Sequence, residues 1–272
     1  MKILFIGDIY GRSGREALQC HLPTLKQKLT PDVTIVNVDN AANGRGITPK
    51  QAAEFYEWGA DCLTGGDHIW DQRQIIPYID KDPKLLRPIN FPANTPGKGS
   101  LLFQTQSGET CLIIHALGRV FIDPADNPFT VVKDLIDRHP MGSKTNSIFI
   151  DFHAEATSEK MALAQYLDGK VSAVIGSHTH IQTADDHVME GGTAYMTDAG
   201  MTGDYNSVIG ARKDIAIHRF INKTPHPERL IPATGDATLC GALVTTHDGT
   251  GLAKAIQPIR IGGCLKQAIP EN

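Results

Sequence analysis

Hydrophobic positions along the chain gather in short runs, and each run ends in polar residues or glycine. Seven of these runs are "KILFIGD", "VTIVNVDN", "ADCLTGGDH", "TCLIIHALG", "NSIFIDFHAE", "VSAVIGSHTH" and "TAYMTDAG". Runs of this length that are rich in valine and isoleucine predict strands buried on both faces. The chain should therefore contain several fully buried strands.

Segments of helical character lie between several of these strands. They are "GREALQCHLPTLKQKL", "TPKQAAEFYEWG" and "SEKMALAQYLDG". In the second segment Thr48 is the expected N-cap, Pro49 takes the first helical position, and the helix ends at Gly59. In the third we expect Ser158 as the N-cap and Gly169 at the end. Strands that alternate with helices predict an α/β fold.

A single domain over residues 1–272 is the economical interpretation, because the chain can bury a large core and no break in composition divides it. Two domains stay an alternative. The C-terminal third is less regular than the rest. Its stretch "KTPHPERLIPATGD" predicts a long loop or a small loop-rich insertion near residues 202–240.

The charge balance bears on the partners that the protein could have. A net charge of −4 gives no support to a general binder of nucleic acids or membrane surfaces. The opening apolar run is too short for a signal peptide, and no run reaches the roughly 18 apolar residues of a membrane span. The five cysteines form no C-x-x-C pair, so we expect them to be reduced. These features predict a cytoplasmic protein without a membrane partner or a stable nucleic-acid complex. A homo-oligomer is favoured only because homo-oligomers are common among proteins in general.

Side chains of types that can bind metals follow five of the predicted strands. They are Asp8, Asp39 with Asn40, Asp67 with His68, His153, and His178 with His180. In open α/β sheets the functional crevice lies at the carboxyl ends of the strands. His178 and His180 would also point the same way on an extended backbone. Each residue alone has an ordinary explanation as a turn former, a cap or a core histidine. Their coincidence at five strand ends favours a site for manganese, iron or zinc.

The same stretches resemble a known family. "GDIYG", "DNAANGRGIT", "GGDHIWD", "DFHAEATSEK" and "GSHTH" follow in order the signature of calcineurin-like metallophosphoesterases, and specifically of the bacterial YmdB-like group. The similarity includes "RPINFPANTPGKG" and "TDAGMTGDYNSVIG" and extends over nearly the whole chain. It implies a four-layer sandwich of two mixed β-sheets flanked by helices. It also implies a dinuclear metal site and phosphodiesterase activity on 2',3'- or 3',5'-cyclic nucleotides.

The resemblance implies a role for each candidate residue. One metal would be held by Asp8, Asn40 and His180, a second by Asp67, His153 and His178, and Asp39 would bridge the two. The ions would be two divalent or trivalent metals, with iron or manganese favoured over zinc and magnesium. Such a pair clamps a phosphate and activates the attacking water. His68 would protonate the leaving oxygen as the catalytic acid.

Two positions depart from the family pattern. The family usually has Glu where this chain has Asp39, and Asn where it has Asp67. The Asp39 side chain is one methylene shorter than that of glutamate. It can bridge both metals only if they lie closer to the strand end. Asp67 adds a negative charge that should favour cations and oppose phosphate.

Two other interpretations stay open from the sequence. The glycines of "GDIYGRSGREAL", with an acidic residue after the next strand, resemble a dinucleotide-binding unit, but their spacing is not G-x-G-x-x-G. The altered ligands also leave room for a metal-binding regulatory protein with little turnover. A phosphodiester assay with Mn²⁺ separates that protein from an enzyme.

Overall fold

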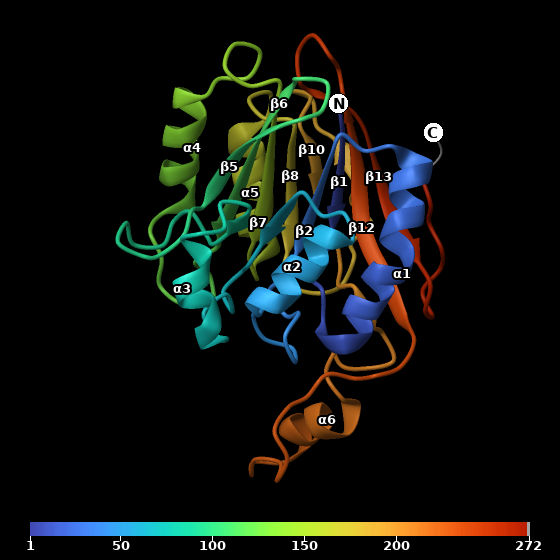
Figure 1. Cartoon of the computed structure of the whole chain (residues 1–272). Helices are drawn as coiled ribbons and strands as arrows, with labels where there is room; N and C mark the ends of the chain where they lie inside the picture. The colour runs from blue at the N-terminus through green and yellow to red at the C-terminus, as the bar shows by residue number, and fades with distance from the viewer. Residues whose placement is uncertain (271–272) are drawn as a thin grey trace.

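The computed structural model describes residues 1–270 as two stacked β-sheets with helices on their outer faces (Figure 1). The seven-stranded sheet contains, in spatial order, β11 (Gly203–Asp204), β12 (Ala237–Thr246), β1 (Lys2–Ile6), β2 (Val33–Asn37), β3 (Cys62–Thr64) and β4 (Leu85–Leu86), with β13 (Ala253–Ile261) paired to β12. Strands β1 to β4 are parallel, whereas β12 runs antiparallel to β1. The sheet is therefore mixed.

The six-stranded sheet has a parallel centre as well. Its order is β5 (Ser100–Gln104), β6 (Thr110–Leu117), β7 (Ser147–His153), β8 (Ala173–Ser177), β10 (Ala194–Met196) and β9 (His187–Val188). Strands β6, β7, β8 and β10 are parallel, and the two outer strands pair antiparallel to them.

Alternate residues of β1 explain why its apolar run is continuous. Phe5 points into the core between the two sheets, where its ring centroid lies 5.3 Å from that of Phe149 on β7. Leu4 and Ile6 point the other way, into the core beneath the helices. Because both faces of the strand are covered, no polar residue is needed in the run.

Helices complete the outer two layers. On the seven-stranded sheet lie α1 (Gly11–Leu29), α2 (Pro49–Glu57) and the short pair η1 (Arg73–Ile75) and α3 (Ile76–Ile79). On the six-stranded sheet lie α4 (Pro128–Arg138) and α5 (Thr157–Leu167). The predicted four-layer α/β sandwich is confirmed.

Two predicted helix starts have different outcomes. The start of α2 at Thr48 is confirmed, because the Thr48 hydroxyl accepts from the Gln51 N–H at 3.3 Å and the Gln51 side chain accepts from the Thr48 N–H at 3.0 Å. The expected N-cap at Ser158 is wrong, because α5 begins at Thr157 after Ala156. The Ala156 carbonyl already accepts from the N–H of Lys160, so the helical hydrogen bonds start earlier.

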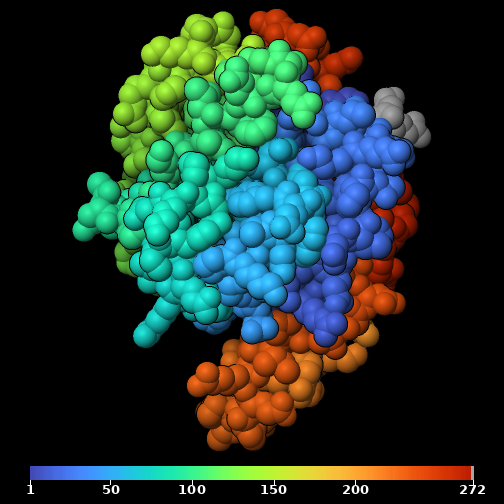
Figure 2. All heavy atoms as spheres, in the orientation of Figure 1, coloured from blue at the N-terminus to red at the C-terminus, as the bar shows by residue number. Residues whose placement is uncertain are grey.

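The segment of residues 202–240 contains a helix that the sequence pattern did not indicate. This helix, α6 (Lys213–Ile221), projects from one end of the sandwich (Figures 1 and 2). Its large apolar side chains Ile217, Phe220 and Ile221 are exposed, so α6 has no continuous buried face. None of the helices within residues 1–270 combines the length and the apolar character needed to cross a membrane.

Candidate metal centre

The carboxyl ends of the parallel strands from both sheets meet at one end of the sandwich. His153 is the last residue of β7, and its ring nitrogens lie 3.7 Å from an Asp8 oxygen and 3.6 Å from an Asp39 oxygen. Asp8 and Asp39 follow β1 and β2 of the other sheet. The predicted site residues therefore come together across the gap between the sheets rather than along the edge of one sheet.

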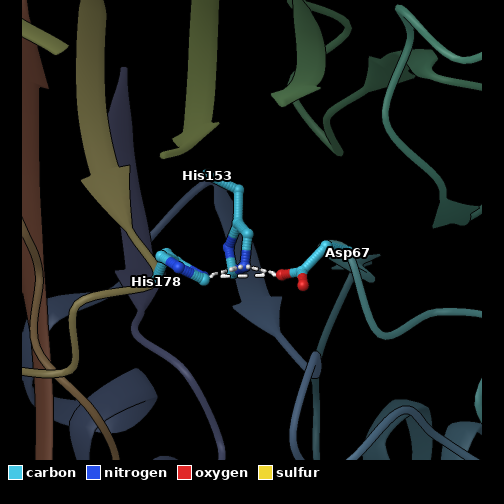
Figure 3. A group of neighbouring side chains, drawn as sticks. All are labelled: Asp67, His153 and His178. Atoms are coloured by element: carbon cyan, nitrogen blue, oxygen red, sulfur yellow. Dashed lines mark hydrogen bonds and ion pairs between the residues drawn. The ribbon is translucent and has the colours of Figure 1, made fainter. Parts of the chain in front are cut away.

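Asp67, His153 and His178 form the centre of this group (Figure 3). The His153 Nε2 atom lies 3.0 Å from Asp67 Oδ1 and 3.1 Å from His178 Nδ1. Burial lowers the pKa of His153 to about 4, so its ring is neutral near pH 7. Burial also lowers the pKa of His178, but the hydrogen bond to Asp67 and the nearby carboxylates outweigh it and raise that pKa above its usual value.

The Ser177 hydroxyl fixes the orientation of the neutral His153 ring through a contact with its Nδ1 atom. The Ser177 hydroxyl donates to Asp151 at 2.6 Å, so its lone pairs are left to accept from Asn37 at 3.2 Å and from His153 Nδ1 at 2.9 Å. This arrangement places the proton of His153 on Nδ1. The lone pair of Nε2 then faces the carboxyl groups of Asp39 and Asp67.

Asn40 and His180 show the same pattern on the other side of the site. The Asn40 amide nitrogen donates to the Gly44 carbonyl at 3.2 Å, which turns Asn40 Oδ1 toward His180 Nε2, 3.0 Å away. His180 Nδ1 donates to the Ile209 carbonyl at 2.8 Å. Burial lowers the pKa of His180 to about 4, so Nε2 carries a lone pair. Two acceptors that face each other at this distance are stabilised by a cation between them.

The Asp8 and Asp39 carboxylates are buried with little to balance their charge. Asp8 Oδ1 has no hydrogen-bond partner among residues 1–270, and the side chain is fully buried. Burial, followed by the charges of Asp198 and Asp151, raises the pKa of Asp8 to about 8. Burial and the neighbouring Asp67 and Asp8 raise the pKa of Asp39 well above its usual value. A bound cation would compensate this charge.

The turn that carries His178 and His180 is held in a strained backbone conformation. Both residues have positive φ angles, 94° and 69°, which non-glycine residues rarely adopt. Between them, the Thr179 N–H and hydroxyl both donate to Asp198, at 3.0 and 2.7 Å. Asp198 is itself paired with the buried Lys160 at 2.8 Å. This buried ion pair therefore fixes the turn that aims both imidazoles.

His68 lies at the edge of the group. Its backbone N–H donates to Asp39 at 2.8 Å, while its ring Nδ1 lies 3.2 Å from Asp71 and its Nε2 lies 3.9 Å from Asp67. Asp71 also contacts Arg45 at 3.4 Å. The ring is thus held at one nitrogen, and the other faces the site.

An open cleft of about 360 Å³ leads to these residues. Besides the predicted residues its lining includes Tyr10, Arg45, Glu155, Ile209 and Leu230. Glu155 lies 3.3 Å from His178 Nε2. The sequence analysis missed Glu155, although it is two residues after His153. It also missed Asp198, which is the aspartate of the predicted run "TAYMTDAG". Ile209 and Leu230 have no sequence signal of this kind.

The residues present fit a metal centre. Aspartate oxygens, an amide oxygen and imidazole nitrogens converge here, and Asp39 and His153 each belong to two of the three groups that could hold a metal ion. Oxygen and nitrogen donors of this kind suit iron, manganese and zinc. The chemistry of the donor set does not select among these metals.

Comparison with known proteins places the chain among similar sequences and structures. The family described as YmdB-like protein matches residues 4–259. A relative from Bacillus subtilis strain 168, named 2',3'-cyclic-nucleotide 2'-phosphodiesterase, is 46% identical over 96% of this chain and 97% of the relative.

Two solved structures resemble the fold closely. One is a hypothetical protein from Thermus thermophilus, with a TM-score of 0.89 and 37% identity over 97% of this chain and 100% of the other. The second, described as a novel phosphatase from Mycoplasma pneumoniae, has a TM-score of 0.89 and 33% identity over 99% and 95% of the two chains. The chain therefore belongs to the YmdB-like family of metallophosphoesterases.

Proposed function

We propose that this protein hydrolyses the phosphodiester bond of 2',3'-cyclic nucleotides with two metal ions bound where the two sheets meet. The convergence of imidazole nitrogens, carboxyl oxygens and an amide oxygen from both sheets is the observation that carries the proposal. The similarity to the Bacillus subtilis phosphodiesterase over nearly the whole chain supports the choice of substrate.

The contacts support two groups of ligands. Asp8, Asn40 and His180 would hold one metal, and Asp67, His153 and His178 would hold the other. Asp39 would bridge them, since its carboxylate lies 3.6 Å from His153 and accepts from the backbone of His68. Iron or manganese is proposed first because the family resemblance implies these metals.

Two cations bound in this way would polarise the phosphate and lower the pKa of an attacking water. The chain contributes the remaining steps. Ser177 and the Ile209 carbonyl keep the two neutral imidazoles in the tautomers that present Nε2. His68, oriented by Asp71, would donate a proton to the leaving ribose oxygen. This proton transfer is needed because an alkoxide is a poor leaving group.

Substitution of one residue from each ligand group tests the proposal. We expect Asp8→Ala and His178→Ala each to lower the metal content and to abolish hydrolysis of 2',3'-cyclic adenosine monophosphate. Metal per chain is measured by elemental analysis, and the rate by product chromatography. Glu57→Ala and His187→Ala are the matched controls. Each removes an exposed side chain away from the site, a carboxylate in the first case and an imidazole in the second.

Full metal content together with full activity in either site variant would rule out the ligand assignment. Bound metal in the wild-type protein without hydrolysis of a 2',3'- or a 3',5'-cyclic nucleotide would instead favour a metal-binding regulatory protein. A rate on the 3',5'-cyclic isomer that exceeds the rate on the 2',3'-cyclic isomer would reverse the choice of substrate.

A further inference from the structure

The cleft extends beyond the candidate metal ligands. We call the four lining residues Tyr10, Arg45, Ile209 and Leu230 the outer part of the cleft, and the candidate ligands with His68, Glu155 and Thr179 its inner part. A volume of about 360 Å³ is in the range of small-molecule sites. A phosphate group held at the inner end would leave room in the outer part for the rest of a nucleotide.

Ile209 links the outer part to the site. Its carbonyl accepts from His180 Nδ1 at 2.8 Å, while 53% of the residue is exposed and lines the cleft. Its φ angle is 45°, which is costly for a β-branched residue. The strained backbone is held because the next residue, Gly210, packs so closely on the Tyr10 ring that an added Cβ would lie 2.6 Å from it.

The chemistry of the outer part differs from that of the inner part. Ile209 and Leu230 offer aliphatic surface, and Tyr10 packs its ring edge-on against His180 with centroids 5.3 Å apart. Arg45 is the one lysine or arginine of the cleft lining within residues 1–270, and its guanidinium is largely exposed. Aliphatic side chains and a planar guanidinium both pack well on the flat faces of an aromatic ring.

We propose that Tyr10, Arg45, Ile209 and Leu230 form a subsite for the nucleobase of the substrate. The inference rests on the proposed function, since a 2',3'-cyclic nucleotide joins one charged phosphate to one flat, uncharged base. Ile209 and Leu230 flank α6 in the chain, one on each side of it. The segment around α6 therefore determines specificity for the base, and the strand ends provide the chemistry.

Ile209→Gly is the sharpest test of the subsite. Glycine keeps the carbonyl that orients His180 and tolerates the positive φ, so only the apolar side chain is lost. Leu230→Ala is a second variant, and Phe220→Ala is the control, because Phe220 is 86% exposed on α6 and does not line the cleft. Two substrates are compared in the metal-loaded protein: 2',3'-cyclic adenosine monophosphate and ribose 2,3-cyclic phosphate, which has no base.

The subsite predicts that Ile209→Gly and Leu230→Ala each raise KM for the cyclic nucleotide about tenfold, which corresponds to ~1.4 kcal/mol. In Leu230→Ala the value of kcat/KM for the base-free substrate and the metal content should not change, and in Ile209→Gly the loss on the cyclic nucleotide should exceed any loss on the base-free substrate. Calorimetry provides a readout without turnover: affinity for adenosine 3'-monophosphate should fall, and affinity for inorganic phosphate should not. Phe220→Ala should behave as wild type in both experiments.

Equal losses on both substrates would overturn the subsite, because the residues would then serve the metal centre. Unchanged kinetics on the cyclic nucleotide in both variants would overturn it as well, because the base would lie elsewhere. A wild-type protein that hydrolyses neither substrate would refute the proposed function itself. That result is distinct from a loss confined to the variants.

Discussion

His68 differs from the other site residues in how it is held. Its ring contacts Asp71 at 3.2 Å and does not lie between buried acceptors. We expect His68→Ala to retain both metals and to slow turnover by roughly 10²–10⁴-fold, the usual effect of losing a general acid. Substrates with good leaving groups should show a smaller loss. Reduced metal content in this variant would instead make His68 a ligand with Asp39 and Asp67.

Asp67 is where the chain departs from its family's usual asparagine. Burial raises the pKa of Asp67, but its close contacts with His153 and His178 outweigh it and lower that pKa below its usual range. The carboxylate is therefore ionised, and a unit charge at about 4 Å contributes roughly 4 kcal/mol at an effective dielectric of 20. We expect Asp67→Asn to weaken metal binding while tightening inorganic phosphate binding at saturating metal by about tenfold or more.

Metal and phosphate titrations of Asp67→Asn, with Asp39→Glu as the companion variant, check this expectation. Asp39→Glu keeps the charge and should change the metal spacing more than the phosphate affinity. Tighter metal binding in Asp67→Asn, or unchanged phosphate affinity, would show that the extra charge is neutralised by another group.

Single residues show how far the sequence could predict the site. Asp8, Asp39, Asp67 and His153 were predictable because functional residues gather at the carboxyl ends of strands, and the structure brings them together from both sheets. Their roles as ligands stay proposals. Ile209 was not predictable, because its place depends on a strained turn far from any strand end.

The turn between β8 and His180 depends on a buried ion pair that joins two other elements. Asp198 lies just after β10, and Lys160 is in α5. Removal of one partner of a buried pair leaves an uncompensated charge, which typically costs about 3–5 kcal/mol. We expect Asp198→Asn to lower the free energy of unfolding by about this amount and to weaken metal binding, because Thr179 would be held less firmly.

Urea denaturation and metal titration measure the two effects. The double variant Lys160→Met, Asp198→Asn is the control, since it removes both charges and should recover part of the stability. A single variant as stable as wild type, with unchanged metal affinity, would show that the pair does not hold the turn.

Elements differ in how well the sequence predicts them. The buried strands were predicted because a strand covered on both faces has a continuous apolar run, as in β1. The start of α2 was predicted because Thr48 and Gln51 form a capping box. The start of α5 was not, because Ala156 has no capping side chain. Helix α6 was missed because only Ile215 and Ala216 are buried on it.

The whole molecule brings the proposed metal ligands together between its two sheets. Periodicity predicted an α/β fold, but only the family resemblance implied two stacked sheets, because no local pattern records which sheet a strand joins. The stacking matters for function: β1, β2 and β3 supply carboxylates from one sheet, and β7 and β8 supply imidazoles from the other. Neither sheet alone would complete the proposed metal centre.

Hydrolysis of 2',3'-cyclic adenosine monophosphate during a metal titration tests the central claim most directly. The protein is first stripped with a chelator, and Mn²⁺ is then added in measured equivalents per chain. The account predicts no activity without metal and a rate that rises until two equivalents are bound. Activity in the stripped protein, or a rate that saturates at one equivalent, would contradict a centre of two metals shared between the sheets.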